Sequence, residues 1–81
     1  MKINLYYDRL TGKSINAGKY KSESQIEAPD RCNVRDLITL LEAPKDRRDS
    51  LLVHVNGEPA WNTTILKEND SVKLFLMLGG G

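Results

Sequence analysis

Alternation of apolar and polar residues near both ends of the chain restricts the fold more than any other feature. At the start, Ile3, Leu5 and Tyr7 fall on one face and the residues between them on the other. This two-residue period is that of a β-strand, so residues 2–8 are predicted to form one. Residues 71–78 alternate in the same way. With 81 residues in all, we expect one small domain with a strand from each end of the sequence.

A single segment has the longer period of a helix. Its apolar residues recur three or four positions apart, at Val34, Leu37, Ile38 and Leu41. Asn33 is predicted to cap the first turn by accepting a backbone N–H, and Asp36 is favoured there by the helix dipole. Because proline cannot continue a helix, Pro44 limits the other end, and we expect a helix over 33–42.

Three further segments have the composition of connections and short strands. Residues 9–24 are predicted to form a long hairpin connection, which leads to a ragged second strand that finishes around 25–28. The continuous apolar run 51–55 is predicted to be a buried strand. The dipeptide 56–57 is Asn-Gly, which favours a two-residue turn because both residues accept positive φ. Residues 58–61 are therefore expected to fold back as a short partner strand.

The predicted order of elements is strand, strand, helix, strand, short strand and strand. The residues at 67–70 supply the turn before the last strand. With only one helix to cover the sheet, the expected fold class is α+β, in which a mixed sheet of four to five strands packs on that helix.

Charge, cysteine content and hydropathy exclude several classes of protein. Twelve Lys and Arg against eleven Asp and Glu give a formal net charge of +1, so there is no bulk electrostatic case for binding nucleic acid or an anionic membrane. The longest apolar run, 75–78, is far too short to span a bilayer. Cys32 has no second cysteine to pair with, and no signal peptide is recognisable, so a cytoplasmic protein is expected.

Three glycines, 79–81, follow the last predicted strand. Glycine lacks a side chain and is the most flexible residue, so these residues are expected to form a narrow thread that ends in a free carboxylate. A carboxylate is a poor electrophile, but an ATP-dependent partner enzyme can convert it into an acyl-adenylate that sulfur or nitrogen attacks. The competing interpretation is a frayed end or a cloning remnant.

Five pieces of the sequence follow one another in a recognisable order, namely 1–10, 34–38, 53–58, 66–72 and the terminal glycines. In that order they resemble the ThiS/MoaD-like sulfur carriers, which are ubiquitin-like β-grasp proteins. The resemblance covers nearly the whole chain. It implies a β-grasp domain over 1–78 and a flexible tail over 79–81.

The resemblance implies that the chemistry takes place at the carboxylate of Gly81. An E1-like adenylyltransferase of the ThiF/MoeB type is expected to adenylate Gly81 with ATP, after which the carboxylate becomes a thiocarboxylate and donates its sulfur. Gly80 and Gly81 match the terminal diglycine of the family, and Gly79 is an extra glycine. The chain is then a protein cosubstrate and not an enzyme, unless it is counted as a synthase small subunit. It is expected to hold no bound cofactor and to be a monomer when free.

The sequence leaves the sulfur acceptor open. The long connection 9–24 resembles the start of the molybdopterin synthase small subunit, whereas the turn at 69–70 and the compact second half are closer to the thiamine carrier. The expected acceptor enzyme is one such as a thiazole synthase or the large subunit of molybdopterin synthase, and a tRNA base or an amino-acid precursor also remains open as the acceptor of the sulfur. Two other functions remain: a ubiquitin-like modifier conjugated through the same Gly81, and a β-grasp binding module without tail chemistry.

Partners of this family usually grip the tail and an apolar patch on the sheet beside it. Phe75 and Met77 alternate away from the apolar face of the last strand. Both are therefore expected either to contact a partner or to pack under a loop. The same two alternatives apply to Trp61.

Two further residues have side chains that catalysts use. Cys32 precedes the helix cap, where an apolar residue commonly packs onto the fourth helical position, so we interpret it as structural and not as a nucleophile. His54 has no second ligand nearby in the sequence and is predicted to be either an outward strand residue or one whose hydrogen bonds are satisfied within the fold. A single cysteine also excludes a ferredoxin-like cluster protein of the same fold.

Overall fold

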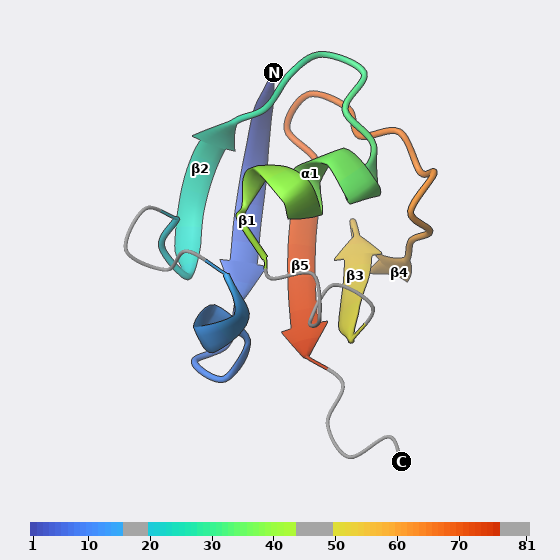
Figure 1. The fold of residues 1–81 in the computed structure, drawn as a ribbon. Helices are drawn as coiled ribbons and strands as arrows, with labels where there is room; N and C mark the ends of the chain where they lie inside the picture. The colour runs from blue at the N-terminus through green and yellow to red at the C-terminus, as the bar shows by residue number, and fades with distance from the viewer. Residues whose placement is uncertain (16–19, 44–49, 77–81) are drawn as a thin grey trace.

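The structure is a computed structural model that describes residues 1–15, 20–43 and 50–76. Within these ranges the chain forms a five-stranded sheet, one α-helix and one 3-10 helix (Figure 1). In chain order they are β1 (Lys2–Tyr7), η1 (Thr11–Ser14), β2 (Glu23–Glu27), α1 (Val34–Leu40), β3 (Leu51–Val55), β4 (Glu58–Pro59) and β5 (Ser71–Leu76). The predicted fold class and order of elements are confirmed, and η1 is an addition to them. No helix in these ranges is long and apolar enough to cross a membrane.

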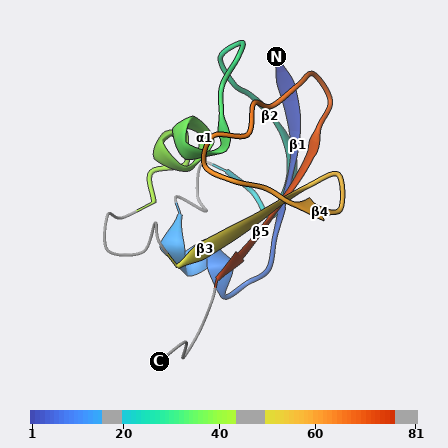
Figure 2. The same cartoon turned by 90° about the vertical axis from the view of Figure 1, so that its right-hand side faces the viewer.

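The sheet has the order β2-β1-β5-β3-β4, so the first and last strands lie side by side at its centre (Figure 1). β1 pairs antiparallel with β2 and parallel with β5, whereas β5 pairs antiparallel with β3. α1 lies across one face of this sheet, as Figures 1 and 2 show. The strand that leads to the glycines is therefore paired on both of its sides.

The hydrophobic core fills the space between α1 and the sheet. On the sheet side, the alternating residues Ile3, Leu5 and Val72 are fully buried, as their pattern predicts. On the helix side, Leu37 and Leu41 are fully buried as well. Removing apolar surface from water is the main favourable contribution to folding. The alternation in β1 and β5 therefore decides which face of the sheet the helix covers.

Both ends of α1 have local causes. Asn33 Oδ1 accepts the Asp36 N–H at 2.8 Å, and the Asp36 carboxylate accepts the Asn33 N–H at 3.2 Å. This reciprocal capping box confirms the predicted cap. The predicted end at Glu42 is wrong: α1 ends at Leu40, and Glu42 has a left-handed backbone with φ of 61°, a conformation in which helices commonly end. Pro44 lies outside the described residues.

The turn between β3 and β4 has the predicted form. Asn56 and Gly57 have φ of 53° and 85°, as a two-residue hairpin turn with positive φ at both positions requires. The predicted partner strand over 58–61 is too long, because β4 is confined to Glu58–Pro59. Directly after β4 the Ala60 N–H still donates to the Val53 carbonyl at 2.9 Å, and the N–H of residue 61 then donates to the Thr64 hydroxyl, also at 2.9 Å.

The other strand boundaries differ little from the sequence prediction. β1 stops short of Asp8, because the Asp8 carboxylate turns to accept the Thr11 N–H at 2.7 Å. β2 finishes inside the predicted range 25–28. β5 extends to Leu76, and the last two residues of the predicted strand 71–78 lie outside the described residues.

One face of the sheet has no helix over it in the part of the chain that the structure describes. The prediction of a buried strand over 51–55 is wrong on this face. Leu51 and Val53 are buried under α1, but Leu52 between them keeps 46% of its surface exposed. Because neighbouring residues of a strand point to opposite faces, a single helix cannot bury all three.

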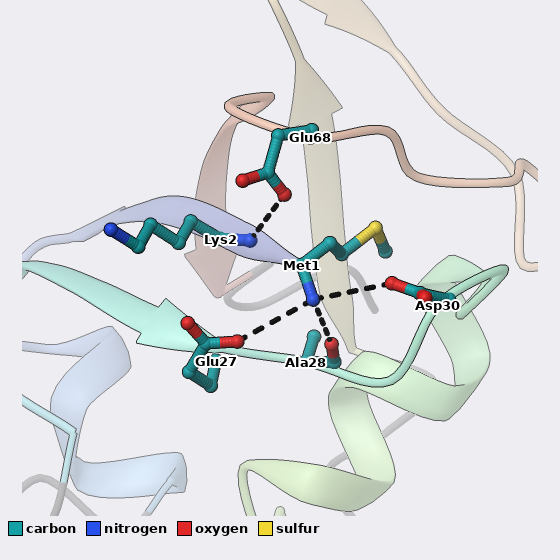
Figure 3. A network of polar contacts seen from close by, with 6 residues as sticks. All are labelled: Met1, Lys2, Glu27, Ala28, Asp30 and Glu68. Atoms are coloured by element: carbon teal, nitrogen blue, oxygen red, sulfur yellow. Dashed lines mark hydrogen bonds and ion pairs between the residues drawn. The ribbon is translucent and has the colours of Figure 1, made fainter.

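The α-amino group of Met1 is held by three acceptors at the start of β1 (Figure 3). It donates to the Ala28 carbonyl at 2.8 Å and pairs with the carboxylates of Glu27 and Asp30 at 3.4 and 3.3 Å. Desolvation lowers the pKa of this amine, but the hydrogen bonds and charges of Asp30 and Glu27 outweigh it, so the pKa is raised. These contacts join the start of β1 to the segment between β2 and α1.

Candidate functional site

The predicted chemistry belongs to the tail, and the structure describes the strand that leads into it. Gly79, Gly80, Gly81 and Met77 lie outside the described residues. Leu76 ends β5 and is the last described residue; we call it the tail root. β5 pairs with β1 on one side and with β3 on the other. Residue 77 therefore follows directly on a strand at the centre of the sheet.

A buried hydroxyl group contacts the tail root. The Leu76 N–H donates to Thr11 Oγ1 at 3.0 Å, and Thr11 has no exposed surface. Thr11 is the first residue of η1, and its own N–H donates to Asp8 Oδ1. The sequence offers no signal for this contact, because the two partners are 65 positions apart.

Five side chains lie together on the sheet face opposite α1. Leu52 of β3 is opposite Phe75 of β5, and His54 is opposite Lys73. On the other side of β5, Tyr6 is the partner of Lys73. Alternate residues of a strand share a face, so all five lie on the outer one. We call Tyr6, Leu52, His54, Lys73 and Phe75 the outer patch.

Phe75 is held on the open sheet face by two neighbours. Its ring is edge-to-face with the His54 ring, with centroids 5.1 Å apart and planes at 67°. The Lys73 Nζ is 5.2 Å from the Phe75 centroid, which is within cation–π range. Phe75 is partly exposed and sits among strand side chains. Its part in binding a partner stays a prediction.

Trp61 lies beyond the edge of the sheet, with 76% of its surface exposed. It lines a groove along β3 together with Leu52, Val53 and Pro59. Leu52 thus has Phe75 across from it in the sheet and the Trp61 groove on its other side. Sequence reasoning missed Leu52. The signal that finds it is strand alternation in β3, applied together with the presence of a single covering helix.

Cys32 has the buried position predicted for it. Its side chain is 3% exposed, and its Sγ donates to the Asn33 carbonyl at 3.3 Å. Desolvation, with a smaller contribution from the charge of Asp36, raises the pKa of the thiol. The reactive thiolate is therefore disfavoured. Among the residues that the structure describes, no three or more His, Cys, Asp and Glu side chains gather as a metal site requires.

A mixed sheet with parallel first and last strands at its centre, and one helix across a single face, is the ubiquitin-like β-grasp fold. The family model described as the ThiS family matches residues 9–81. The chain belongs to the ThiS family. The resemblance in the sequence is thereby confirmed at the level of fold and family.

Solved structures with this fold include a candidate molybdopterin converting factor, subunit 1, from Pyrococcus furiosus. It is 25% identical, with a TM-score of 0.71 over 96% of this chain and 99% of that chain. A structure of SAMP1 from Haloferax volcanii has a TM-score of 0.69 at 17% identity over 100% of both chains. A second, of small archaeal modifier protein 1 from H. volcanii, has 0.69 at 18% identity over 95% of this chain and 98% of that chain. The comparison with curated proteins found no match.

Proposed function

We propose that this protein is a sulfur carrier whose reacting group is the carboxylate of Gly81. The observation that carries the proposal is that the ThiS family model extends to residue 81 and includes all three glycines. β5, which precedes them, is hydrogen-bonded on both sides. β5 therefore fixes the start of the glycine tail. Because the tail has no side chains, a narrow active site on another enzyme can admit it.

Sulfur loading takes two steps on a partner enzyme of the ThiF/MoeB type. First, a carboxylate oxygen of Gly81 attacks the α-phosphate of ATP, which releases pyrophosphate and leaves an acyl-adenylate. Next, hydrosulfide or an equivalent donor attacks the acyl carbon and AMP departs, so that sulfur replaces one carboxylate oxygen. The chain is a cosubstrate in both steps, and the partner binds the ATP.

The outer patch is the proposed docking surface for that enzyme. Leu52 and Phe75 are cross-strand neighbours beside the tail root, and apolar side chains exposed together on one face are typical of protein interfaces. Trp61 extends this surface across the β3 edge, and Met77 is expected to join it. A partner bound there has Gly81 within reach, because the five residues after Leu76 span at most about 18 Å.

Intact-mass spectrometry tests the proposal directly. The chain is incubated with ATP, hydrosulfide and a ThiF/MoeB-type enzyme from the same organism, and a mass gain equal to the exchange of one oxygen for sulfur is expected. A chain that ends at Gly79 is the matched control and should gain no mass. If the full chain also gains none with an enzyme that loads another carrier, the carrier function is wrong and a binding module without tail chemistry remains.

A molybdopterin synthase large subunit is the acceptor that we favour over a thiazole synthase. The support for it is the likeness to a candidate molybdopterin converting factor subunit. The thiocarboxylated chain is mixed with each acceptor enzyme and its substrate, and loss of the sulfur mass is followed. Loss with the thiazole synthase alone would reverse the assignment.

A ubiquitin-like modifier is the second candidate, supported by the fold shared with small archaeal modifier protein 1. In that case the same adenylate ends in an isopeptide bond between Gly81 and a lysine of a target protein. Conjugates of higher mass in cell lysate, absent when the chain ends at Gly79, would identify this function.

A further inference from the structure

The connection between β1 and β2 has no part in the chemistry proposed above, yet one of its side chains is completely buried. Thr11 has 0% of its surface exposed, although it carries a polar hydroxyl group. That hydroxyl accepts the Leu76 N–H at 3.0 Å. A loop from the first part of the chain is therefore bonded to the tail root.

The bond lies where β5 has lost its β1 neighbour and is paired only with β3. β1 pairs with β5 as far as Tyr7 and Leu74, and then the chain turns away at Asp8. Leu76 is two residues further along β5, and alternate residues of a strand direct their N–H groups to the same side. The Leu76 N–H thus points past the end of β1. The Thr11 hydroxyl provides the acceptor that one more residue of β1 would have provided.

Thr11 is itself held by Asp8. The Asp8 carboxylate accepts the Thr11 N–H at 2.7 Å, and the Gly12 N–H donates to the Asp8 carbonyl at 3.0 Å. Hydrogen bonds from the side chain and the backbone of Thr11 lower the pKa of Asp8. Because a hydroxyl donates one hydrogen bond and accepts others, Thr11 links Asp8 to the tail root.

We propose that Thr11 is a positioning residue that fixes the point from which the glycine tail extends. The inference rests on the proposed carrier function. With the Thr11 bond in place, five residues follow the last amide bonded on the β1 side. Without it, the last such residue is Leu74. Leu76 then keeps only its pairing with Leu51 at the end of the β3 ladder, and when this end opens, the tail that enters the partner's active site lengthens by up to two residues.

The expected effect on reactivity follows from the length of that thread. The effective concentration of a tethered group falls with about the −3/2 power of tether length, so a change from five to seven residues lowers it about 1.7-fold. Phe75 lies between Leu74 and Leu76, so release of the tail root also loosens this side chain of the outer patch. We therefore expect the kcat/KM of adenylation to fall by up to about 1.7-fold from tail length alone without Thr11.

Amide hydrogen exchange, followed by NMR, tests the contact in the free chain. Thr11→Val keeps the shape and removes the hydroxyl, and the Leu76 amide should exchange about two- to tenfold faster, the range expected for one neutral hydrogen bond. Thr11→Ser should restore the slow exchange. Thr64→Val is the matched control, because Thr64 Oγ1 also accepts a backbone N–H, that of Trp61, at 2.9 Å. It should leave Leu76 unchanged.

Adenylation kinetics with the ThiF/MoeB-type enzyme test the consequence. Thr11→Val should lower kcat/KM measurably, by up to about 1.7-fold from tail length alone, and Thr11→Ser should restore it. A chain that keeps Thr11 but has two glycines inserted after Gly79 should have a kcat/KM about 1.7-fold lower, with Leu76 amide exchange unchanged. This insertion variant separates the effect of tail length from damage to the fold.

Three results would overturn the positioning role: unchanged Leu76 exchange in Thr11→Val, faster exchange with unchanged kcat/KM, or full activity of the glycine insertion. If Thr11→Val does not fold, the insertion and the protection of the wild-type Leu76 amide still decide the question. If wild-type chain gains no sulfur mass, the carrier function itself is wrong. The exchange data then still report whether Thr11 holds the strand end.

Discussion

The two faces of β5 contrast sharply, although their residues alternate along one strand. Val72 and Leu74 point under α1 and are at most 1% exposed. Lys73 and Phe75 point the other way, where no helix of the described chain covers them, and Phe75 contacts both Lys73 and His54. The inner residues of β5 are aliphatic, whereas its outer residues include an aromatic ring and a cation, with the His54 imidazole of β3 beside them.

This contrast separates stability from recognition. An inner residue contributes through the water it excludes, so its replacement changes the free energy of unfolding. An outer residue contributes through the surface it leaves for a partner, so its replacement changes binding. Because β5 also leads into the glycines, both contributions meet at the strand that presents the proposed reacting group.

The largest expected effect is on folding stability, and it is tested by comparing one substitution on each face of the sheet. Leu74→Ala should lower the free energy of unfolding by about 2–5 kcal/mol, because it opens a cavity under α1. Leu52→Ala, on the neighbouring strand, should lower it by less than about 1 kcal/mol, since Leu52 is already 46% exposed. Urea unfolding measures both. Equal losses would mean that the outer face is as tightly packed as the inner one.

Much of this arrangement follows from local signals in the sequence. The alternation around Leu5 and Leu74 predicts the buried face, and the Asn56-Gly57 pair predicts the hairpin, because each depends on neighbouring residues alone. Asn33 and its capping box are local in the same sense. These are the features of the fold that the sequence predicts correctly.

Other features depend on contacts between distant segments. The exposure of Leu52 depends on how many helices cover the sheet, which an apolar run cannot reveal. The burial of Thr11 depends on Leu76, 65 positions away. For the site, the family resemblance predicts that Phe75 and Trp61 either contact a partner or pack under a loop. The position of Leu52 between them requires the register of β3 on β5.

The next effect concerns binding by the outer face. Phe75→Ala should raise the KM of the ThiF/MoeB-type enzyme for this carrier about tenfold, as truncation of an aromatic anchor at an interface does. Trp61→Ala should raise it less, because Trp61 lies beyond the sheet edge. Urea unfolding of both variants provides the control, and their losses should be well below that of Leu74→Ala. An unchanged KM in both variants would place the docking surface elsewhere.

The smallest expected effect is a pH dependence of folding stability. It comes from Asp8, and the aliphatic residues of the inner face have no such dependence. Hydrogen bonds from Thr11, with a smaller contribution from the charge of Lys73, lower the pKa of Asp8 against an opposing desolvation. A group whose pKa is lowered in the folded state stabilises the fold above its unfolded pKa, about 3.9 for Asp, and loses that contribution as the pH falls through the folded value. The stability difference between wild type and Asp8→Asn should therefore be present at neutral pH and shrink below about pH 4.

Urea unfolding of both chains across a pH series measures this difference. Leu74→Ala is the control, because an aliphatic side chain does not titrate and its cost should stay nearly constant over the same range. If the stability difference between wild type and Asp8→Asn stayed the same at low pH, the negative charge of the Asp8 carboxylate would contribute nothing to folding stability. The bonds that hold Thr11 would then owe their strength to geometry alone, and the tail root would be equally firm at every pH.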